Sequence, residues 1–465
     1  MGEYEDFISS KAMVVPLTGI ADPPALSARL KEHQRLLTRW ALRRGRAAIF
    51  ADTGLGKGWM ILEWCRVVSE HTGKPVLILA PLAVSQQFER EAEKLGTSVT
   101  VCASQDDVRP GINVTNYQKL HKFDVDSFGG VALDEASILK SLDGSTRLAL
   151  IAAFREMPFR LCATATPSPN DHTELGGQAE FLGIMRHPEM LATFFINDTG
   201  DTKSWRLKGH ARQAFWCWIS SWGAIVKMPS DIGCPDDGYV LPPLVYHEHI
   251  VKADQEQARK TGTLFAIEAS TLNEQRAARR GTLDERVRLA ADVANTTEGQ
   301  CIIWCDLNQE SEALTKAIPD AVEVTGSQDD DTKELNIAQF LNGDKRVLVS
   351  KSSLCGFGLN LQMARTVVFC GVTHSFESMY QAVRRSWRYG VDGEVNVHIV
   401  TSELEGAVLT NLKAKMAKAE ELSLETSRHV SAFVRDAVSS AARETIAYNP
   451  SKKIQWPAWL ETSAT

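Results

Sequence analysis

The chain has 465 residues, of which 44% are hydrophobic and 23% are charged, and its formal net charge at pH 7 is −7. This negative charge excludes a general attraction to nucleic acid, so such a partner must meet a local basic patch. No apolar run approaches the roughly 20 residues of a membrane span, and the N-terminus lacks a signal-peptide pattern. The nine Cys are scattered without a C-x-x-C pair, which argues against a zinc site and an extracellular disulfide framework. We expect a cytoplasmic protein with no membrane partner.

The first predicted elements lead up to a glycine-rich loop. Residues 1–26 contain three prolines and are predicted to be irregular. Residues 27–44 follow the spacing of an amphipathic helix, and Gly45 ends it. The same stretch is dense in Lys and Arg, so it is a candidate patch for nucleic acid.

Residues 47–58, AAIFADTGLGKG, have the pattern of a phosphate-binding loop. A short apolar strand is followed by a glycine turn and by the start of an apolar helix, which is the context that such a loop requires. Glycines let backbone N–H groups turn toward an anion, and the helix N-terminus adds partial positive charge. The predicted phosphate-binding residues are Thr53, Gly54, Gly56, Lys57 and Gly58.

Gly58 stands where this type of loop usually carries the hydroxyl residue that ligates Mg²⁺. The sequence leaves three explanations open. The chain holds its metal with fewer protein ligands, recruits Thr53, or binds metal weakly.

Buried strands and helices alternate from the loop to about residue 168, which predicts a doubly wound α/β domain. Chemistry in such a domain lies at the carboxyl ends of the strands. Asp134 and Glu135 follow one of these strands, and Thr164 follows another. Hydrolysis of ATP needs one group to hold Mg²⁺ and another to orient the attacking water. We predict that Asp134 binds the metal and that Glu135 is the base.

Residues 180–245 interrupt this alternation and are rich in aromatic residues. Phe215, Trp218, Ile219 and Trp222 are spaced to share one helix face. We predict a core stripe, with a base-stacking platform as the alternative.

A second alternation of strands and helices runs from about Asp284 to Val400 without a second phosphate loop. Within it, Gln381, Arg385 and Arg388 have the spacing of one helix face. Arginine stabilises the charge that develops on a transferred phosphoryl group. Residues 350–362 run from a strand into Gly356 and Gly358, a pattern that suits close approach to the phosphates of DNA or nucleotide.

Taken together, the ordered motifs resemble those of the superfamily-two helicase motors. The motifs are ADTGLGKG, LDEAS, TATPS, SSLCGFGLNLQ and QAVRRSWRYG. Among these motors the chain looks most like the Swi/Snf-type DNA translocases, especially short forms from bacteriophages and bacteria, over about residues 28–400. The resemblance implies two RecA-like lobes, ATP and Mg²⁺ in the cleft between them, and DNA across both. It also implies that the protein is located in the cytoplasm of a prokaryotic or phage-infected host cell.

The resemblance assigns further roles, residue by residue. Gln34 matches the adenine-reading position, and Thr164 and Thr166 match the motif that couples hydrolysis to lobe movement. Arg385 and Arg388 match the arginine fingers. The remaining nucleotide contacts that it implies are Gly358 and Gln381, and the DNA contacts are Ser85, Asn360 and Gln362. Departures from the family pattern are Gly58, Ser137 in place of His, and Gly371 in place of Asp.

We therefore predict an α/β protein with two RecA-like doubly wound parallel-sheet lobes and an aromatic-rich helical insertion between them. The predicted units are an N-terminal segment, lobe 1 with the ATP site, the insertion, lobe 2 and a C-terminal tail, at residues 1–26, 27–180, 181–245, 246–425 and 426–465. The predicted function is ATP-driven translocation along double-stranded DNA with low sequence specificity; protein partners are not predicted. A strand-separating DNA or RNA helicase and an ATP-binding DNA clamp with little turnover are the alternatives.

Overall fold

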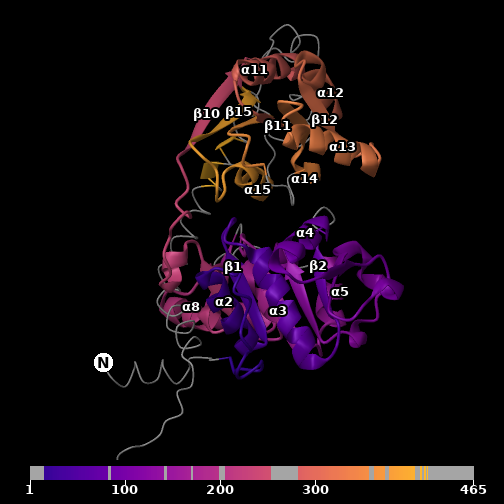
Figure 1. Cartoon of the computed structure of the whole chain (residues 1–465). Coiled ribbons are helices and arrows are strands. Elements are labelled where there is room, and N and C mark those ends of the chain that lie inside the picture. Colours follow the sequence, from indigo (N-terminus) through magenta and orange to yellow (C-terminus); the bar gives the residue numbers. More distant parts are fainter. Residues whose placement is uncertain are drawn as a thin grey trace, which may run out of the picture.

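The computed structural model shows two α/β units (Figure 1). It describes residues 15–81, 85–140, 144–168, 171–197, 205–252, 281–355, 361–371, 376–403, 409–410, 413–414 and 416. Most of the predicted N-terminal segment and the whole predicted tail lie outside the described residues.

The first unit is built on a seven-stranded sheet of order β3-β4-β2-β5-β6-β1-β9, in which all pairs are parallel. Its strands are β1 (Arg46–Ala51), β2 (Val76–Ala80), β3 (Val99–Val101), β4 (Ile112–Asn116), β5 (Gly130–Asp134), β6 (Phe159–Ala163) and β9 (Gly223–Val226). Its helices are α2 (Glu32–Arg44), α3 (Lys57–Thr72), α4 (Ser85–Leu95), α5 (Ser145–Ala153), α6 (Leu175–Phe181), α7 (His187–Phe194) and α8 (Arg212–Ser220), and β7 (Phe195–Asn197) pairs with β8 (Trp205–Leu207).

The second unit has a six-stranded parallel sheet of order β10-β15-β14-β11-β13-β12. Its strands are β10 (Leu244–Val251), β11 (Cys301–Cys305), β12 (Ala321–Val324), β13 (Val347–Lys351), β14 (Thr366–Cys370) and β15 (Val395–Ser402). Its helices are α11 (Leu283–Thr296), α12 (Asn308–Ala317), α13 (Asp330–Leu341), α14 (Ser352–Cys355) and α15 (Phe376–Ser386). In Figure 1, α15 lies at the edge of this unit that faces the first one.

Continuous apolar strands explain both sheets. Every residue of β2 and of β11 is buried, as expected for parallel strands that are covered on two faces. A parallel pair needs a crossover connection, and α5 supplies it between β5 and β6, α13 between β12 and β13, and α15 between β14 and β15. The predicted fold class, an α/β protein with two RecA-like parallel-sheet lobes, is confirmed by this topology.

Part of the predicted insertion, residues 181–245, belongs to the first lobe. Strand β9 pairs with β1 from Ala48–Gly223 to Ala51–Val226, so it completes the first sheet. The aromatic face of α8 is buried in the first core, with Phe215 0% and Trp218 2% exposed, and Trp222 just after the helix is also 0% exposed. This confirms the predicted core stripe and excludes these rings as a base-stacking platform. The other predicted unit boundaries stay predictions.

None of the helices in the described part of the chain is long and apolar enough to span a bilayer.

A buried ion pair in the second lobe gives the first prediction. Arg286 of α11 and Glu310 of α12 are joined at 2.6 Å, and both side chains are 0% exposed. We expect Arg286→Met to lower the free energy of unfolding by about 3–5 kcal/mol, because it leaves the Glu310 charge uncompensated. Urea unfolding followed by circular dichroism measures this.

The exposed pair between Arg186 and Glu189, 3.9 Å apart, supplies the control. Arg186→Met should change stability by about 0.5 kcal/mol or less. The double change Arg286→Met/Glu310→Gln should recover part of the loss. An Arg286→Met variant as stable as the control would contradict the prediction.

Candidate active site

The glycine loop between β1 and α3 has the backbone conformation that its sequence predicts. Gly54 and Gly56 have φ values of +94° and +83°, a region that favours glycine. A Cβ on Gly56 would lie 2.2 Å from the Gln34 amide nitrogen. Helix α3 begins at Lys57, so its unpaired N–H groups face the loop. This is a ready-made site for phosphate groups.

Lys57 is directed into its own loop. Its Nζ donates hydrogen bonds to the carbonyl oxygens of Ala51 at 2.9 Å and Asp52 at 3.3 Å. Burial lowers the pKa of the ammonium group, and the carboxylates of Glu135, Asp52 and Asp134 oppose this effect. A phosphate group in the loop would give the same cation a full negative partner.

Strands β5, β6 and β1 are adjacent in the sheet, so their carboxyl ends bring the predicted catalytic groups together. Burial, followed by the neighbouring Glu135, raises the pKa of the Asp134 carboxyl to about 7. The Tyr117 hydroxyl donates to the Asp134 carbonyl oxygen at 2.6 Å and so holds the end of β5 in place. A cation that binds next to the Asp134 carboxyl would stabilise its charged form and so lower this pKa.

Glu135 has a strained backbone. Its φ of +55° is the only positive value at a non-glycine position among the described residues. Such a conformation costs about 1–3 kcal/mol and is concentrated at functional sites. The Thr164 hydroxyl donates to Glu135 Oε2 at 3.2 Å, and the Thr166 N–H donates to Thr164 Oγ1 at 3.1 Å. The two predicted coupling residues are therefore connected to the predicted base.

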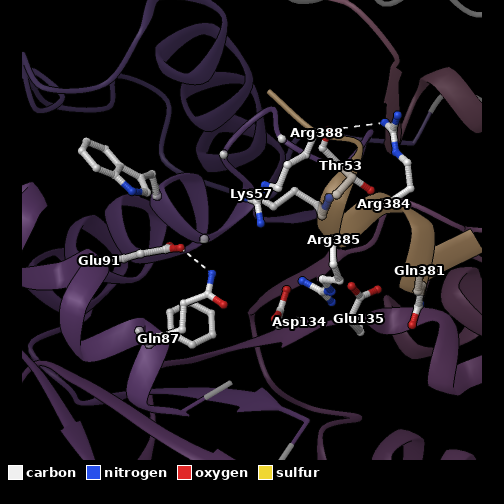
Figure 2. A pocket seen from close by; sticks show the side chains of 16 residues that line it. Thr53, Lys57, Gln87, Glu91, Asp134, Glu135, Gln381, Arg384, Arg385 and Arg388 are labelled. Atoms are coloured by element: carbon white, nitrogen blue, oxygen red, sulfur yellow. Dashed lines mark hydrogen bonds between the residues drawn. The ribbon is translucent and has the colours of Figure 1, made fainter. Parts of the chain in front are cut away.

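Helix α15 of the second lobe forms the opposite wall of the same pocket (Figure 2). The cavity has a volume of about 200 Å³. Both lobes contribute to its lining: Thr53, Gly54, Gly56, Lys57, Gly58, Trp59, Gln87, Phe88, Glu91, Asp134, Glu135, Ala165, Gln381, Arg384, Arg385 and Arg388. Burial lowers the pKa of the Arg385 guanidinium, and the charges of Glu135 and Asp134 oppose this effect.

Arg384 is a contact that the sequence analysis missed. Its guanidinium lies 2.6 Å from Asp52 Oδ2 and donates to the Thr53 carbonyl oxygen at 3.4 Å (Figure 2 shows the second contact). The Tyr380 hydroxyl donates to the other Asp52 oxygen at 3.1 Å. In the sequence, the sign that Arg384 belongs to the site was its position directly before the predicted arginine Arg385. These contacts join the second lobe to the phosphate loop.

The other predicted residues are placed as follows. Gln34 Nε2 donates to the Leu55 carbonyl oxygen at 3.1 Å, and its Oε1 accepts from the Lys31 N–H at 2.9 Å. It therefore lies against the loop but does not line the cavity, and its adenine role stays a prediction. Ser85 begins α4, but its side chain lies outside the described residues, as do Gly358 and Asn360. Gln362 is half-buried in the second lobe and does not line the cavity. The DNA roles of Ser85, Asn360 and Gln362 stay predictions.

The donor set fits a magnesium ion that arrives with a nucleotide. Within the described ranges, no group of three or more His, Cys, Asp or Glu side chains is arranged to hold a metal by itself. Mg²⁺ at phosphoryl-transfer sites is typically held by one or two carboxylates together with phosphate oxygens and water. Asp134, half-buried on the pocket wall, supplies such a carboxylate.

Comparison with known proteins agrees with this geometry. Residues 284–390 match the family model described as the helicase conserved C-terminal domain, so the second lobe carries such a domain. This match bears out the predicted resemblance to the superfamily-two helicases for the second lobe, and it supports a nucleic-acid-dependent ATPase motor. No curated protein matches the sequence.

Among solved structures, the chain is similar to the SWI2/SNF2 ATPase core of Sulfolobus solfataricus in complex with dsDNA. The TM-score is 0.42 and the sequence identity 17%, over 90% of this chain and 98% of that one. The short bacteriophage or bacterial form stays a prediction.

The half-buried carboxyl of Asp134 gives the second prediction. Its pKa of about 7 in the folded protein exceeds the ordinary 3.8. Between about pH 4 and 7 the unfolded chain releases this proton while the folded protein keeps it, so stability is lost as the pH rises through this window. In EDTA at pH 8, we expect Asp134→Asn to raise the melting temperature by about 1–3 °C, and by less at pH 5.

The matched control is Asp331→Asn, at an exposed position of α13. Thermal scans at both pH values should show no such pH-dependent gain for the control. An Asp134→Asn gain that is equal at pH 5 and pH 8 would exclude the Asp134 charge as its cause.

Proposed function

We propose that the protein hydrolyses ATP to ADP and phosphate and uses the energy to move along double-stranded DNA. One observation carries the proposal: a phosphate loop from one lobe and arginines from a helicase C-terminal domain line one pocket. A motor of this type needs ATP to bridge two lobes, so that hydrolysis changes their relative position. The dsDNA preference rests on the motif resemblance over about residues 28–400.

In this mechanism the chain's own groups act on the phosphates. Lys57 and the N–H groups of the loop hold the terminal phosphates, and Arg385 and Arg388 stabilise the charge on the transferred phosphoryl group. Glu135 orients the attacking water, and Thr164 holds its carboxylate by the 3.2 Å hydrogen bond. Asp134 would hold Mg²⁺, which when bound would neutralise part of the phosphate charge.

DNA in this proposal is bound through its backbone. Backbone contacts fix position without reading sequence, so sequence specificity is expected to be low. The net charge of −7 requires that these contacts come from local groups.

The test of the proposed function is the steady-state ATPase rate without nucleic acid, and with single-stranded DNA, duplex DNA or RNA. Strong stimulation by duplex DNA, abolished in Lys57→Ala, is the expected result. A preference for single strands or RNA would replace the proposal with a strand-separating helicase. ATP binding without hydrolysis under every condition would replace it with a DNA clamp.

The second-lobe arginines that line the pocket give a further prediction. We expect Arg388→Ala to reduce the turnover rate by about 10³-fold or more, because it removes a cation that neutralises the transition state. The control is Arg365→Ala, an exposed arginine of the same lobe whose Nη1 donates to the Asp392 carbonyl oxygen. A loss under threefold for Arg388→Ala would remove it as an arginine finger.

A further inference from the structure

Glu91 of α4 occupies the space that Gly58 leaves open. A Cβ built on Gly58 would lie 2.0 Å from Glu91 Oε2 and 3.0 Å from Glu91 Cδ. A side chain at position 58 and this carboxylate therefore cannot both be present in this arrangement. The Glu91 oxygen lies where a serine or threonine at position 58 would place its own side chain.

The exchange has a chemical meaning in a phosphate loop. The usual residue at position 58 contributes a hydroxyl oxygen to Mg²⁺. A carboxylate oxygen is an equally suitable ligand type for this cation, and it adds a negative charge. Glycine at position 58 then has a reason: any Cβ there would displace the Glu91 carboxylate.

Gln87 holds Glu91 in this position. Its Nε2 donates to Glu91 Oε1 at 2.5 Å, one turn earlier on the same helix (Figure 2). This bond engages one carboxylate oxygen and leaves Oε2 facing Gly58. The Gln87 Oε1 atom is buried, and no group in the described part of the chain donates to it. A donor such as a metal-bound water would satisfy it.

The surroundings of Glu91 are those of the phosphate site and not of a surface ion pair. Glu91 and Gln87 line the same pocket as Lys57 and Asp134. Among the residues that the structure describes, Glu91 makes no ion pair within 4 Å. The cations of Arg388, Lys94 and Lys57 still act on its charge. Asp134 and Glu91 together would give Mg²⁺ two carboxylates, and nucleotide phosphates and water would complete its coordination.

We infer that Glu91 is the protein ligand that replaces the missing hydroxyl at position 58 in binding nucleotide-associated Mg²⁺. Gln87 is a positioning residue for it. The inference rests on the proposed function, because the metal enters with the nucleotide. The sequence left three explanations open for Gly58, and this inference replaces them with a fourth, a metal ligand from another helix.

The test measures metal linkage and not activity. Calorimetry on the full chain gives the Kd of ADP in EDTA and in Mg²⁺, and their ratio reports how strongly the metal is bound in the complex. We expect Glu91→Gln to reduce this ratio by about 10-fold or more. Glu89→Gln, which removes a charge from an exposed position of the same helix, should leave the ratio unchanged.

A pair of variants at positions 58 and 91 distinguishes loss of a metal ligand from loss of a negative charge. Gly58→Thr alone should reduce the ratio, because its side chain collides with Glu91. Gly58→Thr/Glu91→Ala should restore it, because the hydroxyl then occupies the vacated space although the negative charge is absent. A simple lack of a hydroxyl predicts the opposite for Gly58→Thr alone, namely a larger ratio.

Each outcome decides one question. A wild-type chain that does not bind ADP at all contradicts the proposed function. A wild-type chain with a metal-dependent Kd and a Glu91→Gln variant with the same ratio overturns the role of Glu91 only. A double variant as weak as Glu91→Gln also overturns ligation, because charge alone would then account for the loss.

Discussion

The site depends on one contact between the lobes, the ion pair of Arg384 with Asp52. It is 2.6 Å long, Arg384 is nearly fully buried, and Tyr380 binds the second Asp52 oxygen. Asp52 directly follows β1, so the contact ties α15 to the start of the phosphate loop. Arg385 of the same helix and Arg388, two residues after its end, line the pocket. Arg384 contacts the loop and its neighbour Arg385 lines the pocket, so a nucleotide in the loop would be linked to the second lobe. A two-lobe motor needs such a link, because nucleotide binding must change the position of one lobe relative to the other.

The site carries features that cost stability. Glu135 has a left-handed backbone, and the half-buried Asp134 carboxyl beside it has a raised pKa. In the proposed function a bound metal cation would compensate the negative charge of the Asp134 carboxylate. Active sites commonly carry such a cost, which the packed core of the lobe offsets.

Much of the fold and part of the site were predictable from local patterns. The apolar runs of β2 and β11 and the glycines at 54 and 56 act within a few residues, so their meaning is visible in the sequence. The extent of the first lobe was not, because β9 joins β1 from far along the chain. The roles of Arg384 and Glu91 were also missed. Each lies in an ordinary charged stretch, and only a partner from elsewhere in the chain distinguishes it from a solvated residue.

The sequence by itself determined the class of fold, the phosphate loop and the residues at the carboxyl ends of the strands, because periodicity and glycine placement are local properties of the chain. It also showed that Gly58 departs from the usual loop. Only the tertiary structure decided what stands in that place: the packing of α4 over α3 puts a Glu91 oxygen 2.0 Å from the Cβ position that Gly58 lacks. Which side chain fills a space depends on how helices pack, and one sequence does not contain that information in any local pattern.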